Sequence, residues 1–377
     1  MSDVQATNTQ VVCPVCGSAR VIPIKWGRRE PSEYAAAERG EIALGGCFFF
    51  ENMPRWHCKN CAQGFGSIFE LDYGWLVDIE TSPELIQRLV AEQFPQWAGL
   101  PVTPVSSPGT SYQHYRMGAD LAVRAPREGD DDEQLLKEWQ WLPRLAPALP
   151  LEVPTPLALG EPTDEYPCPW VVCRWIAGVN ATVAETGAST QAATDLARFI
   201  LALRQIVASD GPIYGEHNFG RGAPLATRDE EVRAALASLA KLNARLDEAA
   251  LAACAAEWDA ALAAPVWDGP PTWIHGDLHP DNLIVDSDQP GQLRGVIDFG
   301  GLGVGDPACD LLPAWALFSG EARVAFRAAL DVDEASWARG RGWALSMALI
   351  ALPYYLYTNP AMVALARHMI AAILTNS

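Results

Sequence analysis

Long hydrophobic runs are missing from this chain of 377 residues. The most apolar stretch, Ala344–Tyr357, covers about fourteen residues and contains Pro353, whereas a membrane-spanning helix needs about 20 apolar residues. We therefore expect a buried helix here and no membrane as a partner. The first residues, MSDVQATNTQ, also lack the basic start and the apolar core of a secretory signal, so we expect a cytoplasmic protein.

Basic residues are also scarce. The chain has 27 Lys and Arg against 46 Asp and Glu, which gives a formal net charge of −19. A surface of this sign repels phosphate backbones, so nucleic acid is excluded as the main partner, whereas a cationic small molecule is favoured. Internal repeats are absent, and the length allows two or three compact units.

Nine cysteines are present, and four of them form a pattern. Two C-x-x-C knuckles are the arrangement that gives zinc a tetrahedral set of thiolate ligands. Four ligands close the coordination sphere, which predicts a structural zinc ion. A disulfide is disfavoured in a reducing cytosol, and a redox C-x-x-C is disfavoured without a βαβ unit around it. The four knuckle residues are Cys13, Cys16, Cys58 and Cys61. The scattered cysteines read as small buried apolar residues: Cys168, Cys173, Cys254 and Cys309.

Residues 1–74 resemble a small stand-alone zinc ribbon, and residues 75–81 look like a connector. So short a segment can hardly fold on apolar burial alone, so the metal is expected to complete a miniature core. The expected core residues are Trp26, Trp56, Phe65 and Phe69.

The most informative stretch reads TWIHGDLHPDNLIVD from Thr272 and is followed by GVIDFGGLGVGDPACDLL. Apolar runs of strand character precede two short loops, one with Asp277 and Asn282 and the other with Asp298. The first loop has the D-x-x-x-x-N spacing of the protein-kinase catalytic loop, and the second has the D-F-G of the kinase metal element. Turn chemistry explains a lone Asp or Asn in a loop, but both motifs in this order predict phosphoryl transfer.

Phosphoryl transfer needs a divalent metal on the phosphate oxygens, held by hard oxygen ligands, and a carboxylate that orients the attacking hydroxyl. Asp277 suits the catalytic base. Asn282 and Asp298 suit the ligands of magnesium.

At these residues the chain resembles the aminoglycoside phosphotransferase family, whose loop reads H-G-D-x-x-x-x-N where protein kinases have H-R-D. The resemblance runs from about Ser82 to the C-terminus. It implies an α+β, two-lobed kinase-like fold, with a small antiparallel-sheet N-lobe (82–176) and a mainly helical C-lobe (177–377). It also implies ATP or GTP as the donor and a small-molecule hydroxyl as the acceptor. His275 would shape the loop, and His279 would act on the γ-phosphate.

The family pattern asks for a lysine on the third N-lobe strand, yet there is no lysine between Cys61 and Leu136. Arg124 occupies the position, and a guanidinium can bond phosphate in a bidentate fashion. Glu138 on the following helix is the expected partner of Arg124, although a surface carboxylate is the other interpretation.

Thr110 and Ser111 lie in the loop that covers the nucleotide phosphates in the family, and a plain hairpin turn explains them equally well. The run Trp170–Trp175 has strand character and lies where the resemblance places the inter-lobe hinge. The backbone near Arg174, Trp175 and Ile176 is therefore expected to meet the nucleotide base. Short antiparallel strands are expected at Val102–Val105, Gln113–Met117 and Leu121–Arg124.

Ser82-Pro83-Glu84 predicts a helix start, with a capping serine followed by proline. Beyond Gly178 the composition becomes rich in alanine. Glu216–Asn218 is interpreted as a surface turn or as the border of an acceptor site, and structural roles are expected for Asp306 and Asp310. Helices are expected at 190–207, 228–264, 321–330 and, with breaks, 334–373.

The sequence thus predicts a small-molecule kinase that uses Mg²⁺ with ATP or GTP to phosphorylate a hydroxyl of an aminoglycoside-like or other small acceptor. Two alternatives stay open. The missing lysine favours a nucleotide-binding module with little transfer activity, and the ribbon favours an adaptor that binds a protein or nucleic acid through its zinc segment.

Overall fold

The computed structural model describes residues 11–25, 36–37, 39–44, 54–61, 63–67, 81–105, 112–127, 132–242, 246–356 and 359–375. The chain forms two compact units, Met1–Val77 and Asp78–Ser377. Among the helices in the described ranges, none has the length and apolar character needed to cross a membrane.

The first unit is built on a small sheet with the strand order β2-β1-β3-β4. β1 pairs in parallel with β2, and β3 pairs antiparallel with both β1 and β4. Trp56 of the expected core lies on β3, opposite Phe65 of β4, whereas Trp26 and Phe69 lie outside the described residues. The strands are β1 (Val21–Lys25), β2 (Ala43–Leu44), β3 (Pro54–Cys58) and β4 (Gly64–Ser67).

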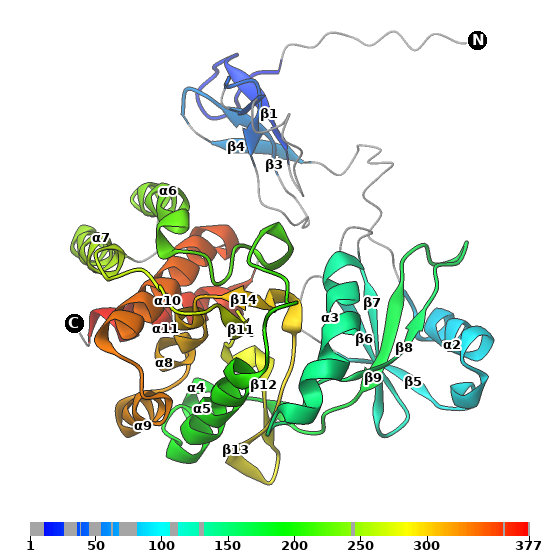
Figure 1. Cartoon of the computed structure of the whole chain (residues 1–377). Helices are drawn as coiled ribbons and strands as arrows, with labels where there is room; N and C mark the ends of the chain where they lie inside the picture. The colour runs from blue at the N-terminus through cyan, green and yellow to red at the C-terminus, as the bar shows by residue number, and fades with distance from the viewer. Residues whose placement is uncertain are drawn as a thin grey trace, which may run out of the picture. The chain divides into compact units, whose positions relative to one another are not determined.

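The second unit begins with a five-stranded antiparallel sheet of order β5-β6-β7-β9-β8 (Figure 1). The four predicted strands of this N-lobe are confirmed, with bounds that differ by at most two residues. They are β5 (Val102–Val105), β6 (Tyr112–Met117), β7 (Leu121–Pro126) and β9 (Trp170–Arg174). The strand β8 (Pro156–Gly160) was not predicted.

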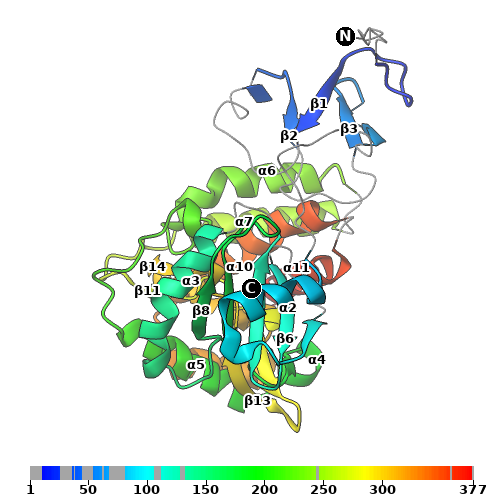
Figure 2. The same ribbon diagram turned by 90° about the vertical axis from the view of Figure 1, so that its right-hand side faces the viewer.

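Helices α2 (Pro83–Gln93) and α3 (Asp132–Leu145) cover opposite faces of this sheet, and Figure 2 views it from the α2 side. α2 starts as predicted, because the Ser82 side chain accepts a hydrogen bond from the N–H of Leu85 at 3.2 Å. Alternate residues of a strand face opposite sides. Val123 accordingly packs in the cluster that contains the α2 leucines, while Ala122 packs with Leu135 of α3. Arg124 shares the face of Ala122.

α3 belongs to both lobes. Leu135 near its start packs in the N-lobe, whereas Trp141, Leu142 and Leu145 belong to the large C-lobe core. The ring of Trp141 lies 4.9 Å from that of Trp273, on the strand that leads to the catalytic motif. The position of α3 is therefore set by packing on two sides.

The C-lobe is mainly helical, as predicted, with α10 and α11 against each other and against α7 (Figure 1). The expected single helical run over 228–264 was wrong. It is divided into α6 and α7, because Asp247 caps a new helix by accepting from the N–H of Ala250 at 2.8 Å. The four longest helices of the lobe in the described ranges are α5 (Thr190–Gln205), α7 (Glu248–Leu262), α10 (Glu334–Tyr355) and α11 (Pro360–Leu374). Shorter α-helices are α4 (Val183–Thr186), α6 (Asp229–Leu239), α8 (Pro313–Ala316) and α9 (Gly320–Leu330).

Two small antiparallel pairings hold the motif loops together. β11 pairs with β14, with Ile274 opposite Gly303, and β12 pairs with β13, with Leu283 opposite Val296. Each pairing thereby joins the strand that enters one motif loop to the strand that leaves the other. β10 adds a third strand beside β12. The bounds are β10 (Val179–Asn180), β11 (Thr272–Ile274), β12 (Leu283–Asp286), β13 (Gln289–Val296) and β14 (Gly303–Gly305).

Short 3-10 helices complete the fold. The turn η4 contains Glu216–Asn218, η6 and η7 lie within the two motif loops, and η8 follows β14. Their bounds are η1 (Pro95–Trp97), η3 (Ala146–Ala148), η4 (Glu216–Asn218), η5 (Leu225–Arg228), η6 (Pro280–Asn282), η7 (Phe299–Gly301) and η8 (Pro307–Leu311).

Candidate active site

The loop that follows β11, which we call the base loop (His275–Asn282), is held by hydrogen bonds to η8. The buried carboxylate of Asp310 accepts hydrogen bonds from the N–H groups of His275 at 2.9 Å and Gly276 at 2.8 Å. Asp306 caps η8 through the N–H of Ala308 and pairs with Arg339 at 2.7 Å. The structural roles expected for Asp306 and Asp310 are confirmed.

His275 links the base loop to the loop that follows β13, which we call the metal loop (Asp298–Leu302). Its Nδ1 accepts from the N–H of Asp277 at 3.2 Å, and its Nε2 lies 3.1 Å from the carbonyl oxygen of Ile297. Burial lowers the pKa of His275. A neutral ring that donates from Nε2 satisfies both contacts, so His275 shapes the loop.

Two glycines let the loops touch. A Cβ on Gly276 would lie 2.5 Å from the carbonyl oxygen of Gly301, and a Cβ on Gly301 would lie 2.8 Å from that of His275. Gly276 also has a φ of 83°, a left-handed conformation that side chains disfavour. The close backbone contact brings the base loop and the metal loop side by side, as the sequence motifs predicted.

Asp277 lies among polar partners and keeps 29% of its side chain exposed. Its carboxylate is 3.7 Å from Nη2 of Arg221 and 3.5 Å from Nε2 of His279, and the amide nitrogen of Asn282 donates to its backbone oxygen at 2.9 Å. Burial works against ionisation, but His279 and Arg221 hold the pKa of Asp277 well below its usual range. Asp277 is therefore a carboxylate at neutral pH.

Asn282 contacts the rest of the base loop through its side-chain nitrogen. Besides the bond to the backbone of Asp277, Nδ2 lies 3.4 Å from Oδ2 of Asp277 and 3.2 Å from Nε2 of His279. The amide oxygen of Asn282 takes part in none of these three contacts. Burial acts against the charge of His279, yet the neighbouring Asp277 raises the pKa of the imidazole. The base loop thus brings together all three of its predicted residues.

Asp298 is an exposed side chain at the start of the metal loop. Its backbone is left-handed, with φ 61°, and its carboxylate accepts from the N–H of Gly300 at 3.2 Å. A non-glycine residue in this region costs about 1–3 kcal/mol, and such strain gathers at functional sites. The exposed carboxylate of Asp298 and the amide oxygen of Asn282 are hard oxygen donors of the kind that magnesium prefers.

Arg124 and Glu138 form the predicted ion pair. The contact is bidentate, through Nη1 to Oε2 and through Nη2 to Oε1 at 3.2 Å, and both side chains are buried. The guanidinium lies 4.5 Å from the centre of the Tyr112 ring. Although burial opposes the charge, Glu138 raises the pKa of Arg124, and Tyr112 and Asp298 add to this effect. The electrostatic influence of Asp298 thus reaches both Arg124 and the base loop.

The expected hinge has little free backbone. The N–H of Arg174 donates to Thr155 at 3.1 Å, and the N–H of Trp175 donates to Asp120 at 2.8 Å. The N–H groups of Arg174 and Trp175 are therefore already bonded within the protein, and the expected contact of Arg174, Trp175 and Ile176 with a nucleotide base stays a prediction. Thr110 and Ser111 lie outside the described residues.

Comparison with known families identifies the family of this chain. The model of the phosphotransferase enzyme family matches residues 102–343, more than half of the sequence. The chain belongs to this family. It is accordingly a phosphotransferase that acts on hydroxyl groups, and the kinase-like α+β fold predicted from its motifs is confirmed.

Several solved structures share the fold of this phosphotransferase. The GDP complex of wild-type aminoglycoside 2'-phosphotransferase-IIIa is 20% identical, with a TM-score of 0.61 and coverage of 78% of this chain and 99% of its own. The GDP and kanamycin complex of APH(2")-IIIa is 19% identical, with a TM-score of 0.59 and the same coverage. The macrolide 2'-phosphotransferase MphH from Brachybacterium faecium is 21% identical, with a TM-score of 0.51 and coverage of 77% and 97%. Among curated proteins, none matches the chain.

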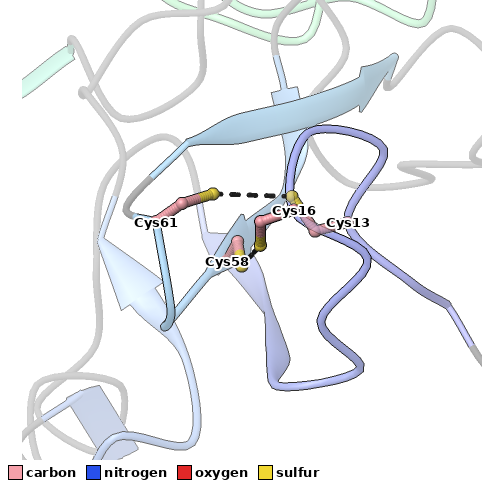
Figure 3. Close-up of side chains that lie close together, drawn as sticks. All are labelled: Cys13, Cys16, Cys58 and Cys61. Carbon is pink, nitrogen blue, oxygen red and sulfur yellow. Dashed lines mark hydrogen bonds between the residues drawn. The ribbon is translucent and has the colours of Figure 1, made fainter.

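The four knuckle cysteines of the phosphotransferase meet in the first unit (Figure 3). All four sulfur atoms lie within 4.8 Å of one another, with 3.6 Å between Cys13 and Cys61 and between Cys16 and Cys58. Four thiolates at about 2.3 Å from a tetrahedral zinc ion would be about 3.8 Å apart. Cys168, Cys173, Cys254 and Cys309 are buried, as predicted.

Sequence reasoning missed Arg221 and Lys137. Arg221 follows the turn η4 and faces Asp277, and the polar, glycine-rich stretch GEHNFGRG was the available signal for it. Lys137 immediately precedes Glu138, and its ammonium group lies 2.7 Å from the carbonyl oxygen of Gly300 in the metal loop. Its signal was its isolation, because it is the sole lysine between Lys59 and Lys241.

Proposed function

We propose that this phosphotransferase transfers the γ-phosphoryl group of ATP or GTP to a hydroxyl group of a small acceptor, such as an aminoglycoside, in a magnesium-dependent reaction. The observation that carries the proposal is the contact between the base loop and the metal loop at Gly276 and Gly301. This contact holds the loop of Asp277 against the loop of Asp298. A charged carboxylate with hard oxygen donors for a metal is the combination that phosphoryl transfer requires.

Asp298 and the amide oxygen of Asn282 would hold magnesium, which supplies positive charge to the phosphate oxygens. Arg124 would meet the phosphates of the nucleotide from β7, held in place by Glu138. Its Nε is buried without a partner among the described residues, so one N–H remains for an anion. His279, whose pKa is raised by Asp277, would add positive charge near the γ-phosphate.

Asp277 would accept the hydrogen bond of the acceptor hydroxyl and align it for in-line attack. As the new oxygen–phosphorus bond forms, the bond to the β-phosphate oxygen breaks, the nucleoside diphosphate leaves, and the hydroxyl proton passes to Asp277. A carboxylate with a depressed pKa is a weak base. Its main contribution is therefore orientation, which suits a loose transition state with late proton transfer.

The chemical class of the acceptor is proposed from the charge of the protein and from the ligands of proteins with the same fold. The net charge of −19 favours a cationic molecule. One structure with this fold is described as a GDP and kanamycin complex, and another as a macrolide 2'-phosphotransferase. We therefore place amino sugars first and amino-sugar macrolides second. In the first unit we propose one structural zinc ion on Cys13, Cys16, Cys58 and Cys61, because their spacing fits its thiolate bonds.

Substitution of Asp277 tests the mechanism. Asp277→Asn keeps the size of the side chain and removes its charge, so we expect kcat to fall about 10²- to 10⁴-fold while the Kd of the nucleotide changes less than about threefold. Product formation with a panel of aminoglycosides, macrolides, choline-like amines and sugars provides the measurement. Asp288→Asn, in the exposed turn between β12 and β13, is the control for loss of one negative charge.

Normal turnover by Asp277→Asn would contradict the assignment of the base. Wild-type protein that binds ATP or GTP but phosphorylates no acceptor in the panel would favour the alternative, a nucleotide-binding module. That alternative draws on one observation, the arginine that stands in place of the family lysine at position 124.

A further inference from the structure

Lys137 is a buried ammonium group that the proposed mechanism does not use. It lies on α3 with 6% of its surface exposed. Its Nζ donates to the carbonyl oxygen of Gly300 at 2.7 Å and to that of His217 at 2.9 Å, and lies 3.3 Å from Nδ1 of His217. A lysine has three N–H donors, and these contacts supply three acceptors. Burial of an ammonium group is costly unless it is fully bonded in this way.

The two carbonyl groups belong to segments that flank the candidate active site. Gly300 follows Asp298 by two residues, within the metal loop. His217 precedes Asn218, whose amide nitrogen donates to the carbonyl oxygen of Arg221 at 3.0 Å and lies 3.4 Å from that of Gly301. Arg221 in turn faces Asp277 at 3.7 Å. A continuous series of contacts therefore connects Lys137 to the metal loop and to the base loop.

Lys137 and Glu138 are consecutive on one helix, so their side chains point about 100° apart. Glu138 bonds to Arg124 on the N-lobe sheet, and Lys137 bonds to the C-lobe. A single turn of α3 thereby fixes the phosphate-binding cation and the metal loop. The packing of Trp141 against Trp273 also holds α3 in place. The metal loop is therefore bonded to a helix whose position is fixed.

We propose that Lys137 is a positioning residue for the divalent metal, because its ammonium group holds the metal loop against α3 and so presents Asp298 together with Arg124. The proposal rests on the function proposed above. Lys137 touches neither the nucleotide nor the metal. It acts through the carbonyl of Gly300, next to the N–H that binds the carboxylate of Asp298.

Replacement of Lys137 by methionine tests this role. Lys137→Met keeps the aliphatic length and removes the donors and the charge. We expect the magnesium concentration for half-maximal nucleotide turnover to rise about 10- to 100-fold, which is typical when a group that supports a metal ligand is lost. The Kd of ATP or GTP in the presence of EDTA should change less than about twofold. Lys137→Arg retains donors and charge and should recover part of the magnesium affinity. Lys241→Met, at an exposed lysine, is the control.

A purely structural lysine would give a different result. The melting temperature of Lys137→Met would fall while the magnesium requirement of the folded protein stayed as in the wild type, and this outcome would overturn the proposal. If Lys137→Met does not fold, the magnesium requirement of Lys137→Gln, which keeps an N–H for one carbonyl, is compared with that of the wild type at lower temperature. Wild-type protein without magnesium-dependent nucleotide turnover would instead refute the proposed function itself.

Discussion

Arg124 and Glu138 are two buried charges whose energetic value depends on their pairing. Removal of one partner leaves the other charge buried and unpaired, which costs about 3–5 kcal/mol, whereas apolar replacement of both is often close to neutral. Within the N-lobe the guanidinium bonds Glu138 through both Nη atoms and lies over the ring of Tyr112, while its Nε has no partner among the described residues. The net effect of the pair on stability is therefore expected to be small.

Substitutions of this pair separate stability from function. We expect Arg124→Met to lower the free energy of unfolding by about 3–5 kcal/mol, and Arg124→Met combined with Glu138→Met to recover most of it. Chemical denaturation measures both. The double variant should still have lost most of its affinity for ATP or GTP, measured by calorimetry. A double variant that binds nucleotide like the wild type would remove Arg124 from the binding site.

The pairing of Arg124 with Glu138 was predictable from the family resemblance, which places a cation at position 124 and its carboxylate partner on the following helix. The contacts of Lys137 were not. Its acceptors are backbone carbonyls, which carry no residue signal, and Gly300 is 163 residues away along the chain. Arg221 was missed for a different reason, since only the folded loop brings it to the carboxylate of Asp277.

Among the elements, η8 braces the base loop. Its Asp310 accepts two backbone N–H groups of the base loop, and its Asp306 pairs with Arg339 of α10. The element thus anchors the base loop to the C-lobe core. Because the paired N–H groups are buried, an acceptor at position 310 is required.

Asp310→Asn tests the anchor. An asparagine offers one acceptor oxygen and turns its NH₂ group toward an N–H, so one hydrogen bond to a charged group is lost. We expect a loss of about 2 kcal/mol in unfolding free energy and a fall in kcat that exceeds any change in the KM of the nucleotide. Thermal unfolding and steady-state kinetics on the same preparation measure the two effects. Unchanged kcat in a destabilised protein would limit η8 to a structural role.

Strands and helix starts were predicted well where a local pattern decides them. β5 has the predicted bounds, and α2 begins at the predicted cap of Ser82. The division between α6 and α7 was not predicted, because alanine-rich sequence favours helix throughout and only the cap at Asp247 marks the break. The hinge amides at Arg174 and Trp175 depend on tertiary hydrogen bonds, which no local pattern encodes.

For the whole molecule, the sequence predicted a small cysteine-bearing segment before a kinase-like portion, and two compact units are formed, Met1–Val77 and Asp78–Ser377. The described residues of the first unit form a short sheet and a cluster of four thiols. Small units of this kind depend on metal for their folding. Their stability is therefore expected to respond to chelation, unlike that of the kinase-like unit.

Metal analysis of the full chain tests the zinc assignment. We expect about one zinc ion per chain, in line with four thiolate ligands, and its loss in Cys58→Ser. Cys254→Ala, in the buried face of α7, should keep the zinc. Chelation should abolish an unfolding transition of the first unit and leave that of the second in place. A folded first unit in a zinc-free preparation would refute the assignment.

Arginine at position 124 also determines how the protein reacts with covalent probes. A nucleotide that carries an acyl phosphate modifies amines, and a guanidinium group remains protonated and inert under the same conditions. The sole amine side chain between Lys59 and Lys241 is that of Lys137, whose nitrogen is enclosed by backbone carbonyls. If Arg124 meets the nucleotide phosphates as proposed, labelling that depends on an acylated lysine would therefore miss this enzyme.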